Sequence, residues 1–166
     1  KTLGGPGASS LKMISARRFA PWLVDRDFII FEQRGTKFAQ PSLQCLEVDE
    51  ATAASAKDRL DRRATRKKEI AAAAKCYKRL TASGIDLDGY NSRENAADIE
   101  DLRRALKLEK INLYGVSYSA RLMLDVIRYY PQGVRSVILE STLPPEVNYD
   151  EVGIDAMVRS LDVLFN

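Results

Sequence analysis

Short apolar segments alternate with amphipathic helical patterns along this 166-residue chain, and few folds accept that order. Residues 27–31 (Asp-Phe-Ile-Ile-Phe), 110–114 and 134–139 are short, mainly apolar runs and predict strands. Strands separated by helices connect through right-handed crossovers and form a mostly parallel sheet. The sequence therefore predicts an α/β fold.

Helical patterns occupy the stretches between these strands. Asn91 and Glu94 form a capping-box pattern in which Asn91 begins a helix, and Ile99, Leu102 and Leu106 follow at helical spacing on one face. A further helix leads to Pro131, which cannot continue it. The segment 134–139 is mainly apolar and rich in β-branched residues, which predicts a strand buried on both faces of the sheet.

A strongly basic segment interrupts this alternation. Ten basic and three acidic residues lie between Lys57 and Arg79, a local net charge of +7 in a chain whose total is +3. The stretch 51–83 contains neither glycine nor proline and predicts one long helix or two helices broken once. Its basic face is either solvated or docks an acidic partner or a membrane surface. The total charge is too weak to indicate nucleic-acid binding.

Two shortages in the composition limit the chemistry. The chain has no histidine, so it cannot by itself complete a mechanism that needs an imidazole base or an imidazole-bound zinc. Its two cysteines are too few for a structural zinc cage, and we expect no metal or cofactor. No apolar run approaches the roughly 20 residues needed to cross a bilayer, so we expect no membrane span.

The pattern changes near the end of the chain. Pro144 and Pro145 interrupt regular structure, and residues 149–165 begin a new helical pattern. Three strands are too few to close a doubly wound sheet with helices on both faces. We therefore expect this chain to be a segment of a larger protein.

The nucleophile turn, Gly115-Val116-Ser117-Tyr118-Ser119, lies where a predicted strand passes into a predicted helix. This is the context of the G-x-S-x-G motif, which exposes a nucleophilic serine at a helix N-terminus. The positions two before and two after the serine need small residues. Gly115 meets that need, and Ser119 stands where glycine is usual, so we expect it to strain the turn without preventing it. A chance G-x-S-x-S in an ordinary turn is the alternative for this motif alone.

The glycine loop, Leu3-Gly4-Gly5-Pro6-Gly7, opens the chain. In hydrolases with a G-x-S-x-G turn, one oxyanion donor is the amide after the nucleophile, here that of Tyr118, and another comes from a loop after an earlier strand. Gly5 is the expected second donor because Pro6 has no amide hydrogen. Alone, such a loop could equally be a plain surface turn.

Three further motifs make the combination specific. Phe31-Glu32-Gln33-Arg34-Gly35-Thr36 is followed by Gln40-Pro41-Ser42-Leu43-Gln44-Cys45, and Leu139-Glu140-Ser141-Thr142-Leu143-Pro144-Pro145-Glu146 ends the third predicted strand. In this order the motifs resemble those of the α/β-hydrolase family of proline iminopeptidases and tripeptidyl aminopeptidases, which carry GGPG, D-Q-R-G-T-G, P-S-L-x-C, G-x-S-Y-G and L-D-S-x-L-P-P-E. The resemblance covers nearly the whole chain.

The resemblance implies an α/β-hydrolase fold, a mostly parallel sheet flanked by helices, which is incomplete in this chain. Residues 1–147 would form a core segment of that fold. A helical, basic insertion would occupy about residues 46–84 of it. Residues 148–166 would be the beginning of a helical lid.

The resemblance also implies roles for individual residues. Ser117 would be the acylated nucleophile, with the amides of Gly5 and Tyr118 as oxyanion donors. Tyr118 would also line the substrate pocket. Arg34 would brace the site by pairing with a carboxylate or with backbone carbonyls, and Gly115 and Ser119 would shape the nucleophile turn.

This chain departs from the family pattern at several positions. Glu32 replaces aspartate, Lys37 replaces the last glycine of the second motif, and Ser119 replaces glycine in the nucleophile turn. The family's catalytic aspartate and histidine lie beyond its lid, after the point where this chain ends. Glu140, at the end of the third predicted strand, is an alternative acid, although the family keeps an acidic residue there without using it in the triad.

Exported relatives carry cysteines that flank this helical insertion, and the resemblance implies a disulfide between Cys45 and Cys76. In the chain-entropy model, closing a loop of about 32 residues stabilises a fold by roughly 3.7 kcal/mol. A disulfide indicates a periplasmic or secreted protein. Two buried free thiols in a cytoplasmic enzyme are the alternative.

Two classes of function are compatible with these motifs. The first is a serine hydrolase that cleaves short peptides near the N-terminus, or small esters or amides, through an acyl-enzyme on Ser117. Its partner would be the remainder of the hydrolase fold, on a second chain or a missing C-terminal part, which supplies aspartate and histidine. The second is a truncated or degenerate relative that serves as a binding or assembly module, motivated by Lys37, Ser119 and the lack of histidine.

Overall fold

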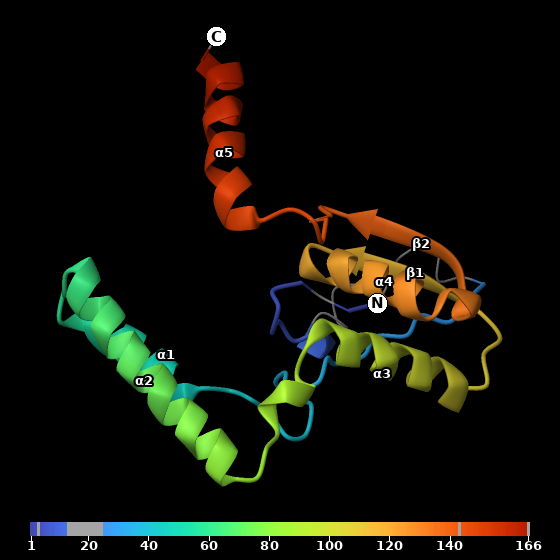
Figure 1. Cartoon of the computed structure of the whole chain (residues 1–166), viewed down its shortest axis with the longest axis horizontal. Coiled ribbons are helices and arrows are strands. Elements are labelled where there is room, and N and C mark those ends of the chain that lie inside the picture. Colours follow the sequence, from blue (N-terminus) through green and yellow to red (C-terminus); the bar gives the residue numbers. More distant parts are fainter. Residues whose placement is uncertain (3, 13–24, 143, 166) are drawn as a thin grey trace.

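The computed structural model describes residues 1–2, 4–12, 25–142 and 144–165. Its elements are α1 (Leu46–Lys57), α2 (Arg62–Ala82), the 3-10 helix η3 (Leu87–Gly89), α3 (Ser92–Ala105), β1 (Ile111–Val116), α4 (Tyr118–Tyr129), the 3-10 helix η4 (Pro131–Gly133), β2 (Val134–Glu140) and α5 (Tyr149–Phe165). The β1-α4-β2 unit and α3 form the body, from which the α1–α2 hairpin and α5 extend (Figure 1). Strands and helices alternate as predicted, which confirms the α/β class.

The sheet is parallel in its described part. β1 pairs with β2 in parallel, with Leu113 opposite Val137 and Gly115 opposite Leu139. Thr2 forms a parallel bridge to Gly115 from the other edge of β1. The first residues of the chain therefore lie beside the end of β1, next to the turn that follows it.

The predicted strand at 27–31 is an extended segment rather than a regular strand. The Lys1 amino group donates to the Ile29 carbonyl oxygen at 2.6 Å, and the Phe31 amide donates to the Lys1 carbonyl oxygen at 3.4 Å. These two bonds make one step of a parallel ladder. One such step is shorter than a regular strand, and none is assigned to this segment.

β2 is less buried than its composition predicts. Val137 and Leu139 pack against the core, whereas the Ile138 side chain faces away and the residue is 64% exposed. Side chains of successive strand residues point to opposite faces, so one face of β2 is open in the described part of the chain. The prediction of a strand buried on both faces is wrong there, because composition does not say which faces find a covering layer.

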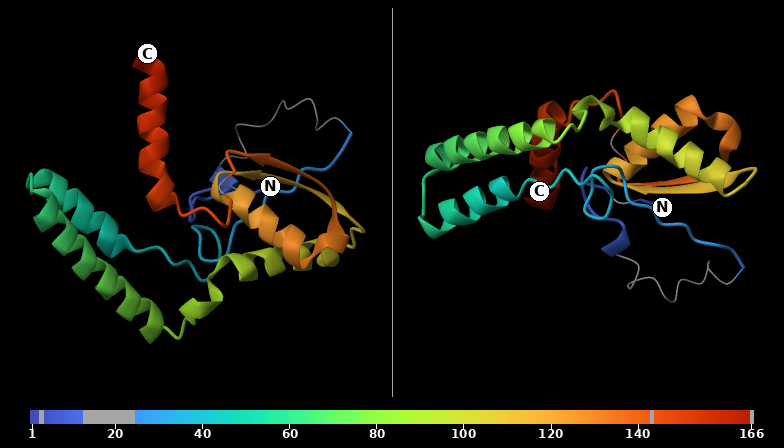
Figure 2. Two further views of the ribbon diagram at one scale, coloured as in Figure 1. Left: turned by 45° about the horizontal axis from the view of Figure 1, so that its top comes forward. Right: turned by 90° about the horizontal axis from the view of Figure 1, so that it is seen from below.

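The core lies between the sheet and two helices. α3 and α4 cover the same face of the β1–β2 sheet (Figure 2). The buried apolar side chains that meet there come from α3, β1 and α4: Ala96, Ile99, Leu113, Leu122, Met123 and Val126. Their removal from water holds α4 against the sheet, and so places its first residue at the end of β1.

α3 begins where the sequence predicts. The Asn91 side chain accepts a hydrogen bond from the Glu94 amide at 2.9 Å, as expected of an N-cap residue. Ile99 is buried against the core, but Leu106 lies at the C-cap and is 48% exposed. The helical face predicted from apolar spacing therefore stops short of Leu106.

The basic segment forms two helices, the second of the two predicted possibilities. α1 and α2 pack as a hairpin, and the Asp61 carboxylate caps α2 by accepting from the Ala64 amide at 2.8 Å. The implied disulfide is present between Cys45, immediately before α1, and the buried Cys76 of α2. Its Cα atoms are 5.4 Å apart, so it ties the open end of the hairpin.

A salt bridge lies beside the disulfide. Nε and Nη2 of Arg79 donate to the Glu47 carboxylate at 2.6 and 3.0 Å, and Nη2 also donates to the Gln44 carbonyl oxygen at 2.9 Å. The Arg79 guanidinium lowers the pKa of Glu47 to about 2. Most of the basic residues at the start of α2 are exposed, and docking of an acidic partner on them stays a prediction.

α5 confirms the helix predicted for 149–165. It stands clear of the body in Figures 1 and 2, and its apolar residues Ile154, Val163 and Phe165 are 65%, 84% and 78% exposed. Within the described ranges, no helix has both the length and the apolar character that a bilayer crossing requires. The division into a core at 1–147 and a lid from 148 stays a prediction.

Candidate active site

Ser117 is the single residue between β1 and α4. Its backbone has φ +57° and ψ −126°, a conformation that costs a non-glycine residue about 1–3 kcal/mol. Main-chain bonds hold it there: the Ser117 amide donates to the Glu140 carbonyl oxygen, and the Ala120 amide donates to the Ser117 carbonyl oxygen, both at 2.9 Å. The residue is exposed and its side chain makes no capping bond. The fold therefore presents the Ser117 side chain at the surface instead of packing it.

Gly115 permits this sharp change from strand to helix. A Cβ atom at Gly115 would lie 2.5 Å from the Ser119 carbonyl oxygen and 2.7 Å from both N and Cα of Ala120. These are main-chain atoms of the first turn of α4 and cannot rotate away. The small residue expected two positions before Ser117 is thus required by the close approach of helix and strand.

The Ser119 side chain, which we expect to strain the turn, is hydrogen-bonded within it. The residue is buried, and its Oγ accepts from the Val116 amide at 2.7 Å. The same hydroxyl has the Thr2 carbonyl oxygen at 2.8 Å and the Val116 carbonyl oxygen at 2.9 Å as acceptors for its one proton. The extra atoms therefore link the nucleophile turn to the N-terminal residues. A sequence shows the added bulk but not the partners.

The glycine loop, described from Gly4 onward, lies against Ser117. A Cβ at Gly4 would be 2.8 Å from Cβ and 3.0 Å from Oγ of Ser117, so only glycine permits this approach. Gly5, the expected oxyanion donor, is the next residue and has φ +119°, a conformation that favours glycine. Sequence reasoning chose Gly5 and overlooked Gly4, whose contact depends on how the loop folds over the turn.

Buried polar groups fix the start of the loop. Gln33 Nε2 donates to Thr2 Oγ1 at 2.8 Å, and Thr2 Oγ1 shares a hydrogen bond with Ser10 Oγ at 3.0 Å. Thr2, Gln33 and Ser10 are each at most 2% exposed. This network joins the glycine loop to the segment around Gln33. Gln33 belongs to the segment 31–36, whose sequence alone predicts no role for this side chain.

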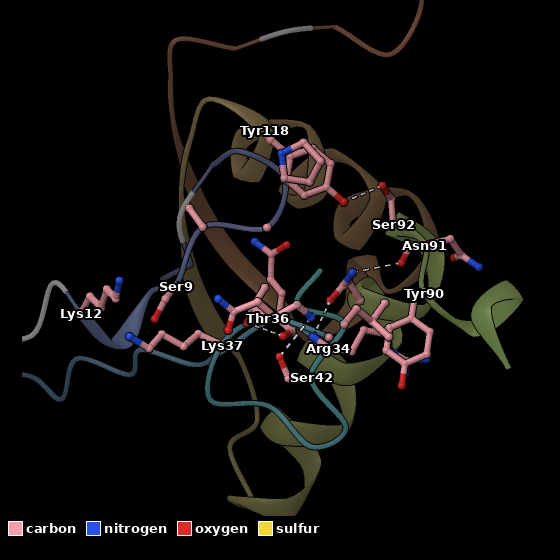
Figure 3. A pocket seen from close by; sticks show the side chains of 18 residues that line it. Ser9, Lys12, Arg34, Thr36, Lys37, Ser42, Tyr90, Asn91, Ser92 and Tyr118 are labelled. Carbon is pink, nitrogen blue, oxygen red and sulfur yellow. Dashed lines mark hydrogen bonds between the residues drawn. The ribbon is translucent and has the colours of Figure 1, made fainter. Parts of the chain in front are cut away.

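Tyr118 follows Ser117 and forms part of the wall of a cavity of about 1010 Å³ (Figure 3). Its hydroxyl shares a 2.8 Å hydrogen bond with Ser92 Oγ at the start of α3, which fixes the ring. The cavity is bounded by the glycine loop, the segment 33–37, the segment 42–44 and the start of α3. The structure thus places Tyr118 in the wall of this cavity, and its role in lining a substrate pocket stays a prediction.

Arg34 pairs with both kinds of acceptor that the sequence suggested. Its guanidinium makes two parallel bonds to the Asp98 carboxylate at 2.8 and 2.7 Å, and donates to the Gly89 carbonyl oxygen at 2.6 Å. The Arg34 amide also donates to Asn95 Oδ1 at 3.2 Å. The hydrogen-bonded Asp98 raises the pKa of Arg34 above its usual value. Arg34 thereby fixes the segment 33–37 to α3 and forms one wall of the cavity.

Glu32 has a structural role, because its carboxylate binds the main chain at Ser10 and Leu11. Its Oε2 accepts from the Ser10 amide at 2.7 Å and from the Leu11 amide at 3.1 Å. Burial opposes the charged form, but the hydrogen bonds that the carboxylate accepts outweigh it and lower the pKa of Glu32. The longer acid that replaces aspartate at this position is therefore held as a carboxylate.

The alternative acid, Glu140, does not meet Ser117 through its side chain. Its carboxylate accepts from the Tyr114 hydroxyl at 2.6 Å, and only its main-chain oxygen bonds the Ser117 amide. The structure therefore gives Glu140 a bracing role at the end of β2.

Comparison with known proteins agrees with this geometry. The family model described as the alpha/beta hydrolase fold matches residues 4–160, which include the glycine loop and the nucleophile turn. This chain belongs to the α/β-hydrolase family. The fold and family implied by the motifs are thereby confirmed.

Two curated proteins are similar to this α/β-hydrolase. The tripeptidyl aminopeptidases of Streptomyces lividans and Streptomyces coelicolor are each 30% identical to it over 152 residues. The alignments cover 86% of this chain, but only 28% and 27% of the two relatives. The chain thus spans about a quarter of the length of these proteins, and it is peptidase-like over most of its own length.

Proposed function

We propose that this chain is the nucleophile-bearing part of a serine hydrolase that removes short peptides from the N-terminus of its substrates. One observation carries the proposal: Ser117 is exposed in a strained turn at the start of α4, with the glycine loop against its side chain. A strained backbone that neighbouring bonds hold in place is typical of catalytic residues.

The proposed reaction runs through an acyl-enzyme. Ser117 Oγ attacks the substrate carbonyl carbon while its proton passes to a histidine supplied by polypeptide outside this chain. The amides of Tyr118 and Gly5 stabilise the negative oxygen of the tetrahedral intermediate. The intermediate then expels the amine, which takes the proton from the histidine. Water repeats the sequence on the ester and releases the acid and free Ser117.

A peptide substrate is supported by the names of the two relatives and by the cavity beside Tyr118, whose volume of about 1010 Å³ suits a short peptide. The same nucleophile turn would also serve an esterase, because fold does not choose the substrate. Matched peptide amides and esters, compared by kcat/KM, distinguish these two forms of the proposal.

The remainder of the fold would be the obligatory partner of this chain, and α5 would be the first helix of the lid. The exposed apolar side chains of α5 and the open face of β2 support that assignment, because such surfaces are normally covered. The Cys45–Cys76 disulfide supports a periplasmic or secreted location over a cytoplasmic one.

A second candidate is a non-catalytic relative that serves as a binding or assembly module, which the lack of histidine favours. Sedimentation and intact mass of the natural protein distinguish the two. A stable species of 18.6 kDa without a companion polypeptide supports the module, because it would have no general base.

Labelling with a fluorophosphonate tests the proposed hydrolase directly. We expect the complete natural protein to form one adduct, mapped by mass spectrometry to Ser117, and S117A to form none. Ser136, an exposed serine of β2 outside the candidate site, provides the matched control, and S136A should label like the wild type. A folded wild-type protein that leaves Ser117 unmodified would refute the assignment.

A further inference from the structure

The cavity beside the nucleophile turn has an unbalanced charge. Its described lining includes three cationic residues, Lys12, Arg34 and Lys37, and no carboxylate. Glu32 lies nearby in the fold, but its carboxylate is bound by the main-chain amides of Ser10 and Leu11 and does not line the cavity.

Arg34 is neutralised, and the two lysines are not. The guanidinium of Arg34 makes its bidentate pair with Asp98 and lies 3.5 Å from Glu94. Among the described residues, no carboxylate comes within ion-pair distance of Lys12 or Lys37; the Lys37 ammonium instead lies 5.4 Å from the Phe38 ring centre. In the view of Figure 3, both lysines extend on the side of the cavity where Ser9 lies.

Lys37 also marks a difference from the family motif, in which the corresponding residue is glycine. A glycine would leave this side of the cavity with one cation fewer and no side chain. The positive charge at residue 37 is therefore a feature of this chain and not of the common motif. Ser117 does not itself line this cavity, but Tyr118, the residue that follows it in the chain, does.

We propose that this cavity binds a carboxylate of the substrate, with Lys12 and Lys37 as its cationic partners. This inference rests on the proposed hydrolase and names its substrate class: short peptides that carry negative charge. The carboxylate comes either from a free C-terminus or from an aspartate or glutamate side chain. The neutral lining, which includes Asn91 and Ser92, leaves room for the uncharged remainder of the peptide.

The test measures how well peptides protect Ser117 of the complete protein from fluorophosphonate. Tripeptides are compared in matched pairs, with glutamate against glutamine at each position and with a free against an amidated C-terminus. For each peptide we measure the concentration that halves the labelling rate. The readout is the ratio of this concentration for the neutral peptide to that for its acidic partner. A change in site geometry that weakens both peptides equally does not alter this ratio. K12Q and K37Q are compared with K75Q, which removes an exposed lysine of α2 that does not line the cavity.

For the wild type and K75Q, we expect at least one acidic member to protect at about fivefold lower concentration than its neutral partner, as a partly exposed ion pair allows. The ratio should fall toward one in K12Q and K37Q and in high salt. The peptide pair that shows the fivefold ratio identifies whether the carboxylate belongs to the C-terminus or to a side chain. Equal protection by all acidic and neutral partners overturns this inference alone, whereas a failure to label Ser117 overturns the proposed hydrolase with it.

Discussion

Replacing Gly115 by alanine tests whether the geometry of the nucleophile turn, and not only the presence of Ser117, creates the reactive group. The added Cβ would lie 2.5 Å from the Ser119 carbonyl oxygen and 2.7 Å from N and Cα of Ala120. Because these neighbours are backbone atoms, the overlap can be relieved only by moving the start of α4 away from β1. That movement would carry the Tyr118 amide with it.

The size of the effect follows from these distances. Cβ atoms essentially never approach other heavy atoms closer than 3.0 Å, so opening the shortest contact moves the start of α4 by about 0.5 Å. Overpacking of this kind costs about 1–3 kcal/mol of folding free energy. Misplacing a catalytic group by about 1 Å costs about 100-fold in rate, so half that distance predicts roughly tenfold slower acylation.

Two assays on the complete protein separate the consequences. Guanidinium titration measures the free energy of unfolding, and the rate of fluorophosphonate labelling measures the reactivity of Ser117 in the folded state. Gly89→Ala is the matched control, because the nearest atom to a Cβ at Gly89 is a guanidinium nitrogen of Arg34 at an ordinary 3.8 Å. If Gly115→Ala matched Gly89→Ala in both assays, the close approach of α4 to β1 would not shape the site.

Three further changes probe the parts that support the site. Ser119→Ala leaves the Val116 amide and the Thr2 carbonyl oxygen without their partner, so denaturant titration should show a loss of about 1–3 kcal/mol in the free energy of unfolding. An unchanged midpoint would contradict the bracing role of Ser119. Replacing Cys45 and Cys76 together by serine should destabilise the α1–α2 hairpin by about 3–4 kcal/mol, seen as faster trypsin cleavage within it; equal cleavage of both proteins would count against this. Arg34→Lys should lose the bidentate pair with Asp98, which lowers the free energy of unfolding by about 1–3 kcal/mol and therefore the midpoint of unfolding in urea. A midpoint equal to that of the wild type would argue that the pair is dispensable.

Local elements could be predicted because their signals are local. The cap at Asn91, the stop at Pro131 and the helix at 149–165 depend on residues within one or two helical turns, and the structure has all three. The basic segment left two possibilities open, since a single break at Asp58 needs no glycine or proline. That ambiguity was resolved by the packing of α1 on α2, together with the Asp61 cap.

Expectations about burial succeeded less well because burial depends on distant partners. Apolar composition suggested that β2 is buried on both faces, but Ile138 is largely exposed in the described structure. The sequence likewise shows the extra bulk of Ser119 but not that its hydroxyl bonds the Thr2 carbonyl oxygen, 117 residues away in sequence. No local pattern reports such a partner, since the hydroxyl of a serine looks the same whether or not it is satisfied.

Local patterns identify the order of elements, the α/β class and the nucleophile candidate, because periodicity and turn chemistry act over a few residues. Three features appear only in the folded molecule: Gly4 closes on Ser117, Ser119 joins the turn to Thr2, and uncompensated lysines share a cavity with Tyr118. These features depend on contacts between segments that are distant in sequence. Parallel pairing of residue 2 with the end of β1 brings segments more than 100 residues apart into contact, and that pairing is stabilised by the whole core and by no single motif.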